Sequence, residues 1–518
     1  MAVAETSERH TETELADAPE NNLMQRLFCS PNRVFLISFV LLLLYNIEAI
    51  QDPPYWDEIV GRFNTAILLK QTGWDFRQLF VLEPGYYEGG SAIGKSFLLT
   101  YVEAVMYAVL PPAAIFVLLH VMTIALAALA FTLSFVLLEK RVGAGLAGLW
   151  SGAAAMLPMW NGQTAALGND VPAAAAVMLG LYAFDRERYG WCCGWVLLAY
   201  LLKSTGIILA LALVTWAVIA AVAAWRTSRV ERQFSGRDIS LLVGPLLLII
   251  GLRFGVDYGE GMEGGAQHLA QGLGRVMGYG KLCIPLLCLS VPVLILVSAG
   301  FFLRKGLWAR ILAHRLELMI TILVLGFWAS FVLYVHSLPR YASFAVFPTA
   351  MAMCLMLPRR VATGLGMVVL CWGAINQHGL LLPKLPSYVG RSGEYLERSR
   401  EYLEDLASNR ALCKYLEENH FERTIVTKYP HLHMLCLPEL GYVSRALPNV
   451  VGTGLAPTTG AAKLLPKGQV IPAGALVLYA PSTFDLLCDV SLMPGPKDRL
   501  IEGDQSLATP VLIYERGQ

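Results

Sequence analysis

Apolar runs, each about as long as a membrane-spanning helix, recur along the chain between Arg33 and Leu382. A helix needs roughly 20 apolar residues to cross a hydrocarbon core about 30 Å thick, and most of these runs reach or approach that length. The pattern predicts about twelve spans, and eleven or thirteen would also fit because some of the runs are short. The predicted spans cover residues 33–50, 95–110, 112–138, 143–160, 171–184, 189–203, 205–225, 239–254, 281–303, 315–336, 341–357 and 361–380.

Polar sequence precedes and follows this apolar region. Residues 1–23 are polar and acidic, a composition typical of disordered segments. No basic, cleavable signal precedes the first span, which is therefore expected to remain as an anchor. After Pro383 the chain becomes more polar and stays so to Gln518. We therefore expect a membrane domain at 24–382, followed by a soluble domain at 383–518.

The soluble region contains patterns of both helix and strand. Residues 394–403 combine charges with apolar positions at helical spacing, whereas residues 424–427 and 475–479 are short apolar runs typical of strands. Two further polar segments, at 51–94 and 255–280, are expected to be long outer loops between spans. The predicted fold class is therefore mainly α, a polytopic helix bundle with a small α/β C-terminal domain.

The composition agrees with a membrane location. Hydrophobic residues make up 56% of the chain and charged residues 15%, whereas soluble proteins have about 25% charged residues. The net charge of +1 gives no electrostatic reason to expect a nucleic-acid partner. Most cysteines lie in or beside apolar runs and are expected to be small buried hydrophobes. Cys413, Cys436 and Cys488 fall in the soluble region, where one disulfide would be allowed but an odd number predicts no framework.

Lysine and arginine are distributed unevenly between the two sides of the predicted bundle. If the N-terminus is cytoplasmic, the connections at 161–170 and 336–340 lie outside and contain one basic residue, Arg340. The inner segments contain many more: Arg26, Arg33, Lys140, Arg141, Arg186, Arg188, Arg226, Arg229, Arg232, Arg237, Arg304, Lys305, Arg310, Arg315, Arg359 and Arg360. This asymmetry follows the positive-inside rule and predicts an extracytoplasmic C-terminal domain.

Two adjacent carboxylates, Asp57 and Glu58, follow the first span. A carboxylate at the mouth of a helix bundle could act as a general base. Acids are, however, also favoured in the first turn of any solvated helix. Residues 57–70 place apolar positions at helical spacing, which predicts an amphipathic helix lying on the membrane surface. A further acid, Glu88, comes just before the second span.

Residues 89–96 match the phosphate-loop pattern G-x-x-x-x-G-K-[ST]. Such a loop needs a preceding buried strand and a soluble α/β sheet, whereas this segment lies between a Pro-Gly turn and an apolar run. We therefore reject a nucleotide site. Its glycines and Lys95 remain suited to contacting a phosphate oxygen at the membrane surface.

Ionisable residues also occur at the ends of apolar runs. Charged groups at membrane depth are costly and are usually paired or functional, although a basic residue at a span end can also reach the headgroups by snorkelling. The predicted topology places one set of acids and bases near the same membrane face: Asp57, Glu58, Glu88, Lys95, Asp170, Lys203 and Arg340. Basic groups neutralise phosphate oxygens, and a carboxylate can deprotonate a hydroxyl. Both needs meet in glycosyl transfer from a lipid-phosphate sugar.

These residues, in this order, resemble the GT-C fold glycosyltransferases, which are multispan enzymes that use polyprenyl- or dolichyl-phosphate sugars. The resemblance covers about residues 33–350 and is in particular to protein O-mannosyltransferases and bacterial lipid A aminoarabinose transferases. It rests on Asp57-Glu58, Tyr86-Tyr87-Glu88, Asp170, the run from Ala183-Phe184-Asp185 to Lys203-Ser204-Thr205-Gly206, and Pro339-Arg340-Tyr341. The glycine-rich sequence after Glu88 departs from the Pro-rich step usual in relatives, so Lys95 is expected to take part of the donor contacts.

The resemblance implies an inverting sugar transfer at the extracytoplasmic face. It assigns Asp57 as the catalytic base or acceptor-orienting acid, with Glu58 beside it and Glu88 as a second acid. It assigns contacts with the donor phosphate and sugar to a further set of residues: Tyr86, Lys95, Lys203, Arg340 and Tyr341.

A divalent cation bridging the phosphate and the acids is compatible with this chemistry. Its candidate ligands are Asp57, Asp170 and His268, although a lone loop histidine is usually solvated. His431 and His433 have only strand spacing and no third ligand in view, so we expect them to be exposed turn residues.

The partners expected are a polyprenyl-phosphate-linked sugar donor, the lipid bilayer, and a glycan, lipid or protein acceptor. The location expected is a bacterial inner membrane. A secondary transporter or lipid flippase is the alternative, but transporters place ionisable residues near the bilayer midplane and often have two similar halves. A catalytically inactive scaffold is a further alternative, which an Asp57→Asn variant would distinguish from an enzyme.

Overall fold

The computed structural model describes residues 30–55, 58–71, 73–74, 97–226, 236–255, 313–333, 339–380, 399–428, 430–453, 463–465, 469–479, 492–504 and 511–517. Several sequence-based predictions lie outside the described residues: those on Asp57, Tyr86, Glu88, Lys95, His268 and Cys488, on the 1–23 tail, on nearly all of the loop at 255–280 and on the span at 281–303.

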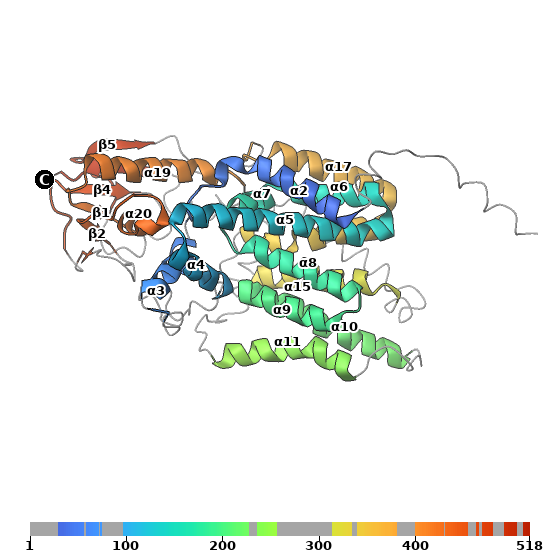
Figure 1. Ribbon diagram of the computed structural model, residues 1–518. Helices are drawn as coiled ribbons and strands as arrows, with labels where there is room; N and C mark the ends of the chain where they lie inside the picture. Colours follow the sequence, from blue (N-terminus) through green and yellow to red (C-terminus); the bar gives the residue numbers. More distant parts are fainter. Residues whose placement is uncertain are drawn as a thin grey trace, which may run out of the picture.

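Helices make up most of the fold and run side by side in a bundle (Figure 1). Their apolar side chains and internally bonded backbone suit a lipid environment, which offers no water to polar groups. Most of the predicted spans correspond to one or two of these helices: α2 (Pro31–Tyr45), α4 (Phe97–Val109), α5 (Pro112–Val142), α6 (Ala144–Ala155), α7 (Pro158–Ala165), α8 (Asp170–Asp185), α9 (Tyr189–Leu202), α10 (Ile207–Arg226), α11 (Gly236–Gly255), α15 (Arg315–Leu333), α16 (Val346–Met356) and α17 (Arg359–Ile375).

Two helices among the described residues are long and apolar enough to cross a membrane by themselves, namely α5 and the helix at Ser204–Ala223. A third span results if α7 and α8, whose axes differ by 112°, act as one broken helix. The remaining apolar helices are shorter. The helical character of the predicted bundle is thus supported, whereas the count of twelve spans stays a prediction.

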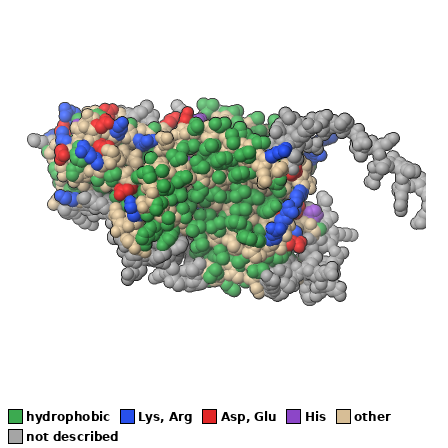
Figure 2. Space-filling view, viewed as in Figure 1, with side chains coloured by type: hydrophobic (Ala, Val, Ile, Leu, Met, Phe, Trp, Pro, Cys, Tyr) green, Lys and Arg blue, Asp and Glu red, His purple; other side chains and the backbone are tan. Residues whose placement is uncertain are grey.

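The two ends of the bundle differ in charge. A broad hydrophobic surface covers the middle of the bundle, and Lys and Arg side chains gather at the end far from the C-terminal domain (Figure 2). At that end Arg141 of α5 lies 2.6 Å from Asp185 and 3.5 Å from Glu317. An apolar belt with a basic end is the surface expected of a membrane protein, and the basic end contains residues predicted to be cytoplasmic.

The C-terminal domain contains a six-stranded sheet with the order β3-β2-β1-β4-β6-β5. Its first four members in that order are parallel, and β6 and β5 continue the sheet as antiparallel strands. The strands are β1 (Ile425–Thr427), β2 (Val450–Gly452), β3 (Lys463–Leu464), β4 (Leu476–Tyr479), β5 (Arg499–Asp504) and β6 (Val511–Glu515). Helices α19 (Tyr402–Asn419) and α20 (His431–Cys436) share a hydrophobic core with the sheet. The predicted strands at 424–427 and 475–479 are β1 and β4, in the centre.

One hydrophobic core joins the C-terminal domain to the segment after α2. This segment contains the π-helix η2 (Ile59–Asn64) and helix α3 (Thr65–Gln71), and its Ile59, Phe63 and Ile67 are fully buried in that shared core. The amphipathic helix predicted on the membrane surface is therefore wrong in its placement. Its apolar side is covered by protein, because the C-terminal domain and the ends of α4 and α5 pack against it.

Hydrogen bonds also cross this seam between the two domains. The Tyr107 hydroxyl of α4 donates to the Glu439 carbonyl at 3.0 Å, and the Tyr442 hydroxyl donates to the Pro54 carbonyl at 2.8 Å. Burial raises the pKa of Tyr442 well above its usual value, so the hydroxyl remains a donor. The C-terminal domain is thus fixed to the loop that precedes η2.

Details of the C-terminal domain differ from the sequence-based expectations. His431 and His433 are buried in α20 and are not exposed turn residues, because α20 packs both of its sides against protein. Cys413 and Cys436 are free thiols. Helix α19 begins at Tyr402, after a turn at 399–401 that packs against the membrane domain, and residues 394–398 of the predicted helix lie outside the described residues.

Candidate active site

The Asp170 carboxylate and the Lys203 ammonium group form a buried ion pair. Asp170 is the first residue of α8, where the helix dipole favours negative charge, and Lys203 directly follows α9. The close packing of α8 against α9 brings these two helix ends together. Snorkelling does not explain Lys203, since its side chain is only 10% exposed and is held by Asp170.

Arg340 and Tyr341 adjoin this pair. They lie at the start of the 3-10 helix η6 (Pro339–Ala345), which packs against α7 and α8. The centre of the Tyr341 ring is 4.2 Å from Lys203 Nζ and 5.4 Å from Arg340 Cζ. An aromatic face attracts cations through its quadrupole. Tyr341 therefore stabilises two positive charges in one place.

Glu58 connects this cationic group to the segment after the first span. Its Oε1 atom lies 3.5 Å from Arg340 Nη1, and the two side chains are 12% and 7% exposed. The Glu58 backbone N–H donates to the Tyr55 carbonyl at 3.2 Å, which fixes the residue at the start of η2. The structure thus brings Glu58, Lys203, Arg340 and Tyr341 together with Asp170.

A third buried ion pair, between Arg62 and Glu103, lies beside the first two. Arg62 Nε is 2.7 Å from Glu103 Oε1, and Arg62 also donates to the Leu167 carbonyl. Arg62 therefore ties η2 both to α4 and to the connection between α7 and α8. Neither residue was among those predicted from the sequence. An acid such as Glu103 inside an apolar run is a signal that could have revealed the pair.

Each of the three ion pairs combines one acid with one base, so the described cluster has no excess of either charge. Each acid in the described cluster has a base within 4 Å, and the pairs are Glu58–Arg340, Asp170–Lys203 and Arg62–Glu103. Completed pairs avoid the high cost of a lone buried charge. An anionic ligand that binds the cations must therefore compete with carboxylates that already hold them.

Gly168, in the connection between α7 and α8, allows three oxygen atoms to approach one point. A Cβ atom on Gly168 would lie 3.1 Å from Gln163 Oε1, 3.4 Å from Glu58 Oε1 and 3.9 Å from Asp170 Oδ2. Within the described part of the chain, Asp170 Oδ2 accepts no hydrogen bond. Carboxylate and amide oxygens are the ligands that Mg²⁺ and Ca²⁺ prefer. These three residues fit a divalent cation, although the described residues include no group of three or more His, Cys, Asp or Glu suited to a metal.

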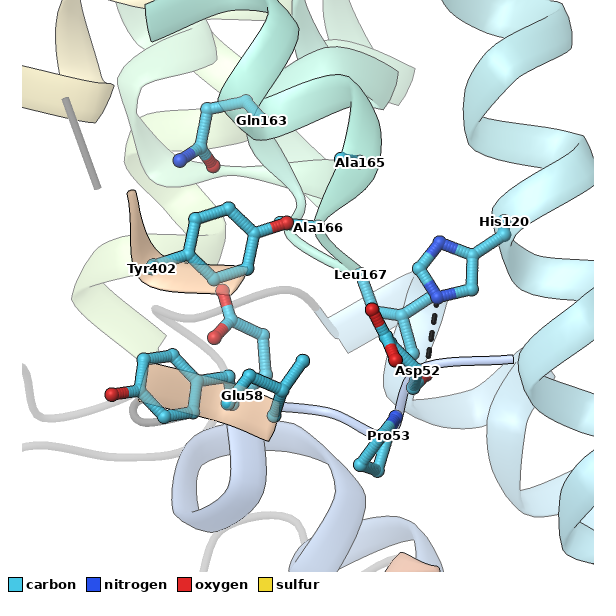
Figure 3. A pocket seen from close by; sticks show the side chains of 11 residues that line it. Asp52, Pro53, Glu58, His120, Gln163, Ala165, Ala166, Leu167 and Tyr402 are labelled. Atoms are coloured by element: carbon cyan, nitrogen blue, oxygen red, sulfur yellow. Dashed lines mark hydrogen bonds between the residues drawn. The ribbon is translucent and has the colours of Figure 1, made fainter. Parts of the chain in front are cut away.

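A narrow, partly enclosed hollow adjoins Glu58 (Figure 3), and the space in and above it, open solvent included, is about 380 Å³. Its lining residues are Asp52, Pro53, Tyr55, Glu58, His120, Gln163, Ala165, Ala166, Leu167, Tyr402 and Leu406. The Glu58 carboxylate points toward Gln163 and Tyr402, and a His120 ring nitrogen lies 3.1 Å from the Asp52 carbonyl. Among these lining residues there is no Lys or Arg, so the described hollow differs in charge from the cationic group on Arg340.

The C-terminal domain supplies one wall of this hollow. Tyr402 and Leu406 belong to α19, and the Tyr402 ring stacks on Tyr55 with 6.0 Å between ring centres. On the opposite edge, Asp52 Oδ1 accepts a hydrogen bond from Arg410 of α19 at 3.0 Å. Burial raises the pKa of Asp52, although Arg410 partly offsets this effect. Residues of α19 were absent from the predicted site because no local pattern relates them to Glu58.

The same fold occurs in two crystal structures of ArnT from Cupriavidus metallidurans. The structure with undecaprenyl phosphate bound matches with a TM-score of 0.50 and 15% sequence identity, over 93% of this chain and 98% of that one. The apo structure matches with a TM-score of 0.51 and 15% identity, over 94% and 98%. ArnT is a lipid A aminoarabinose transferase of the GT-C fold, so the fold predicted from the resemblance is confirmed. No protein-family model and no curated protein matches the chain.

Proposed function

We propose that this protein transfers a sugar from a polyprenyl-phosphate donor to an acceptor hydroxyl, with inversion at the anomeric carbon. The position of Glu58 carries the proposal. Its carboxylate lies 3.5 Å from Arg340, a group suited to phosphate, and it also lines a hollow to which no described cation contributes. One side of the carboxylate therefore suits an anionic leaving group, and the other suits a neutral nucleophile.

Lys203, Arg340 and Tyr341 form the donor side of the proposed site. Arg binds phosphate oxygens as a planar fork and Lys binds them as a point charge. A phosphate that binds Arg340 competes with Glu58 for the same guanidinium group. Donor binding is therefore expected to make Glu58 a stronger base, because the carboxylate loses part of the positive charge that stabilises it. Tyr86 and Lys95 remain further donor contacts by the family resemblance.

The proposed reaction is a single displacement. The carboxylate of the Asp57-Glu58 pair takes the proton from the acceptor hydroxyl, and the acceptor oxygen forms a bond to the anomeric carbon. The bond from that carbon to the phosphate oxygen breaks at the same time, and polyprenyl phosphate leaves with the electron pair. Lys203 and Arg340 stabilise the charge that develops on the leaving phosphate. Glu88 is a second acid in the proposal.

Glu58, Gln163 and Asp170 are the described residues that would hold a divalent cation. Such a cation, when bound, supplies positive charge that stabilises the leaving phosphate. Activity measured with and without a chelator, followed by addition of Mg²⁺ or Mn²⁺, tests this part of the proposal. Full activity in excess chelator would rule it out.

The fold supports the donor class, because one structure with this fold binds undecaprenyl phosphate. The proposed location is accordingly a bacterial inner membrane, with the site on the extracytoplasmic side. The sugar transferred is a hexose or a pentose, and the acceptor is a glycan, a lipid or a protein.

The test is release of polyprenyl phosphate by purified protein from a panel of polyprenyl-phosphate sugars. We expect Glu58→Gln and Asp57→Asn to lower turnover by about 10²-fold or more, the usual contribution of general base catalysis. Glu48→Gln is the matched control, because Glu48 is an exposed acid of the same segment. Lipid or solute movement in liposomes without donor consumption would instead support a transporter.

A further inference from the structure

The hollow beside Glu58 is bounded on one side by a part of the chain with no assigned role. Tyr402, the first residue of α19, places its ring over Tyr55, and its hydroxyl donates to the Gly162 carbonyl at 3.3 Å. Tyr402 thus contacts the segment that positions Glu58 and the helix that carries Gln163. Figure 3 shows its ring beside the Glu58 carboxylate.

This wall is held firmly against the membrane domain. A Cβ atom on Gly162 would lie 2.6 Å from the Ser399 carbonyl oxygen, so the turn before α19 packs directly on the α7 backbone. Arg400 Nη1 donates to Asn46 Oδ1 at 2.6 Å, and its guanidinium lies over the Tyr45 ring. These contacts fix Tyr402 at the hollow, because they hold the start of α19 firmly against the membrane domain.

The charges around the hollow restrict what can occupy it. Asp52 and Glu58 both contribute carboxylates to its lining, and the described lining contains no Lys or Arg. Arg410 contacts Asp52 Oδ1 from outside the lining, at 3.0 Å. A negatively charged group in the hollow would face two carboxylates in a partly desolvated space, where like charges repel more strongly than in water. A hydroxyl can instead donate a hydrogen bond to them.

We propose that this hollow is the acceptor subsite and that it takes a hydroxyl-bearing group without negative charge near the reacting oxygen. Tyr402 of the C-terminal domain is a specificity-determining residue that sets the boundary of this subsite. The proposal rests on the proposed glycosyl transfer, because it names the acceptor side of the same reaction. It places acceptor selection at the seam between the two domains.

The charge preference is tested with two acceptors of equal size, octyl glucoside and octyl glucuronide, and a donor that the wild type consumes. We expect kcat/KM to be at least tenfold higher for the glucoside. In Asp52→Asn the ratio between the two acceptors is expected to fall at least threefold, whereas in Glu48→Gln it stays the same. Equal use of both acceptors, or an unchanged ratio in Asp52→Asn, would overturn the proposed subsite.

The role of Tyr402 is tested by comparison with another seam tyrosine. Tyr402→Leu is expected to raise the acceptor KM at least fivefold and Tyr402→Phe less than twofold, because Phe keeps the ring. Tyr107→Leu is the matched control, since Tyr107 is equally buried and donates across the same seam to Glu439 but does not line the hollow. Equal changes in KM for both leucine variants would indicate a merely structural role and overturn the assignment.

A third variant keeps the test decisive if Tyr402→Leu does not fold. Ala166→Leu adds bulk to the hollow at the end of α7 without removing any hydrogen-bonding side chain, and it is expected to raise the acceptor KM. An unchanged KM in a folded Ala166→Leu protein would overturn the proposal. Failure of the wild type to consume any donor is a separate result, which would overturn the glycosyl transfer itself.

Discussion

Glu58 Oε1 lies 3.5 Å from Arg340 Nη1, although Glu58 follows the first predicted span and Arg340 precedes one of the last. Both side chains are largely buried: Glu58 directly precedes the π-helix η2, and Arg340 lies in the 3-10 helix η6. The pair therefore links the proposed base to the proposed phosphate site.

Arg340→Gln is expected to lower donor turnover by about 10²-fold, because it removes a positive charge aimed at the leaving phosphate. The measurement is kcat and KM for the donor in detergent. Arg359→Gln is the control, since Arg359 is an exposed residue at the start of α17. Equal activity of Arg340→Gln and wild type would exclude Arg340 from donor binding.

Arg62→Met is expected to lower the free energy of unfolding by about 3–5 kcal/mol, because it leaves the buried Glu103 carboxylate without its base. The double variant Arg62→Met, Glu103→Leu should regain much of this stability, since an apolar pair replaces the ion pair. Thermal unfolding followed by tryptophan fluorescence measures both effects. Activity should be low in both variants, because both lose the hydrogen bond from Arg62 to the Leu167 carbonyl. A double variant no more stable than the single one would contradict this account.

Gly168→Ala is expected to lower kcat by about tenfold, because the added Cβ would crowd Gln163 Oε1 at 3.1 Å and fill the space beside Glu58 Oε1 at 3.4 Å. The stability should change little, since Gly168 does not have a positive φ that alanine would strain. Initial rates and melting temperatures measured together separate the two effects. Gly145→Ala, where the new Cβ meets nothing within 4 Å, is the control. Wild-type rates in Gly168→Ala would show that the three oxygen atoms need not stay close.

The C-terminal domain is expected to lose stability in mild acid. Burial lowers the pKa of both His431 and His433 to about 3, from an ordinary value of 6.5. Between pH 6.5 and about 3 the unfolded chain binds protons that the folded chain does not. The free energy of unfolding should therefore fall, as pH decreases through this window, by about 1.4 kcal/mol per pH unit for each histidine.

Unfolding measured from pH 7.5 to 5 checks this pH dependence. A His431→Asn, His433→Gln protein should have a flatter profile, whereas His378→Gln, which changes an exposed histidine, should keep the wild-type slope. The same slope in all three proteins would mean that other groups cause the acid sensitivity.

Local sequence patterns were sufficient to predict most of the helices and to show that charged residues lie at some of the helix ends. Asp170 and Lys203 were found because an ionisable residue at the end of an apolar run is costly unless it has a partner. The central strands β1 and β4 were found because short β-rich apolar runs favour strands in any context. The helix after Asp57 was also predicted, but its surroundings were not. Periodicity identifies an apolar side without indicating whether lipid or protein covers it.

The sequence by itself determined that this is a mainly helical, apolar chain with acids and bases at one set of helix ends and a small α/β domain after them. The tertiary structure decided which charges pair, that Arg62 and Glu103 join them, and that Tyr402 of α19 bounds the hollow beside Glu58. It also decided that His431 and His433 are buried. The physical reason is that propensity and periodicity act over a few residues, whereas ion pairs and domain seams depend on how distant helices pack, and one sequence alone does not specify those distances.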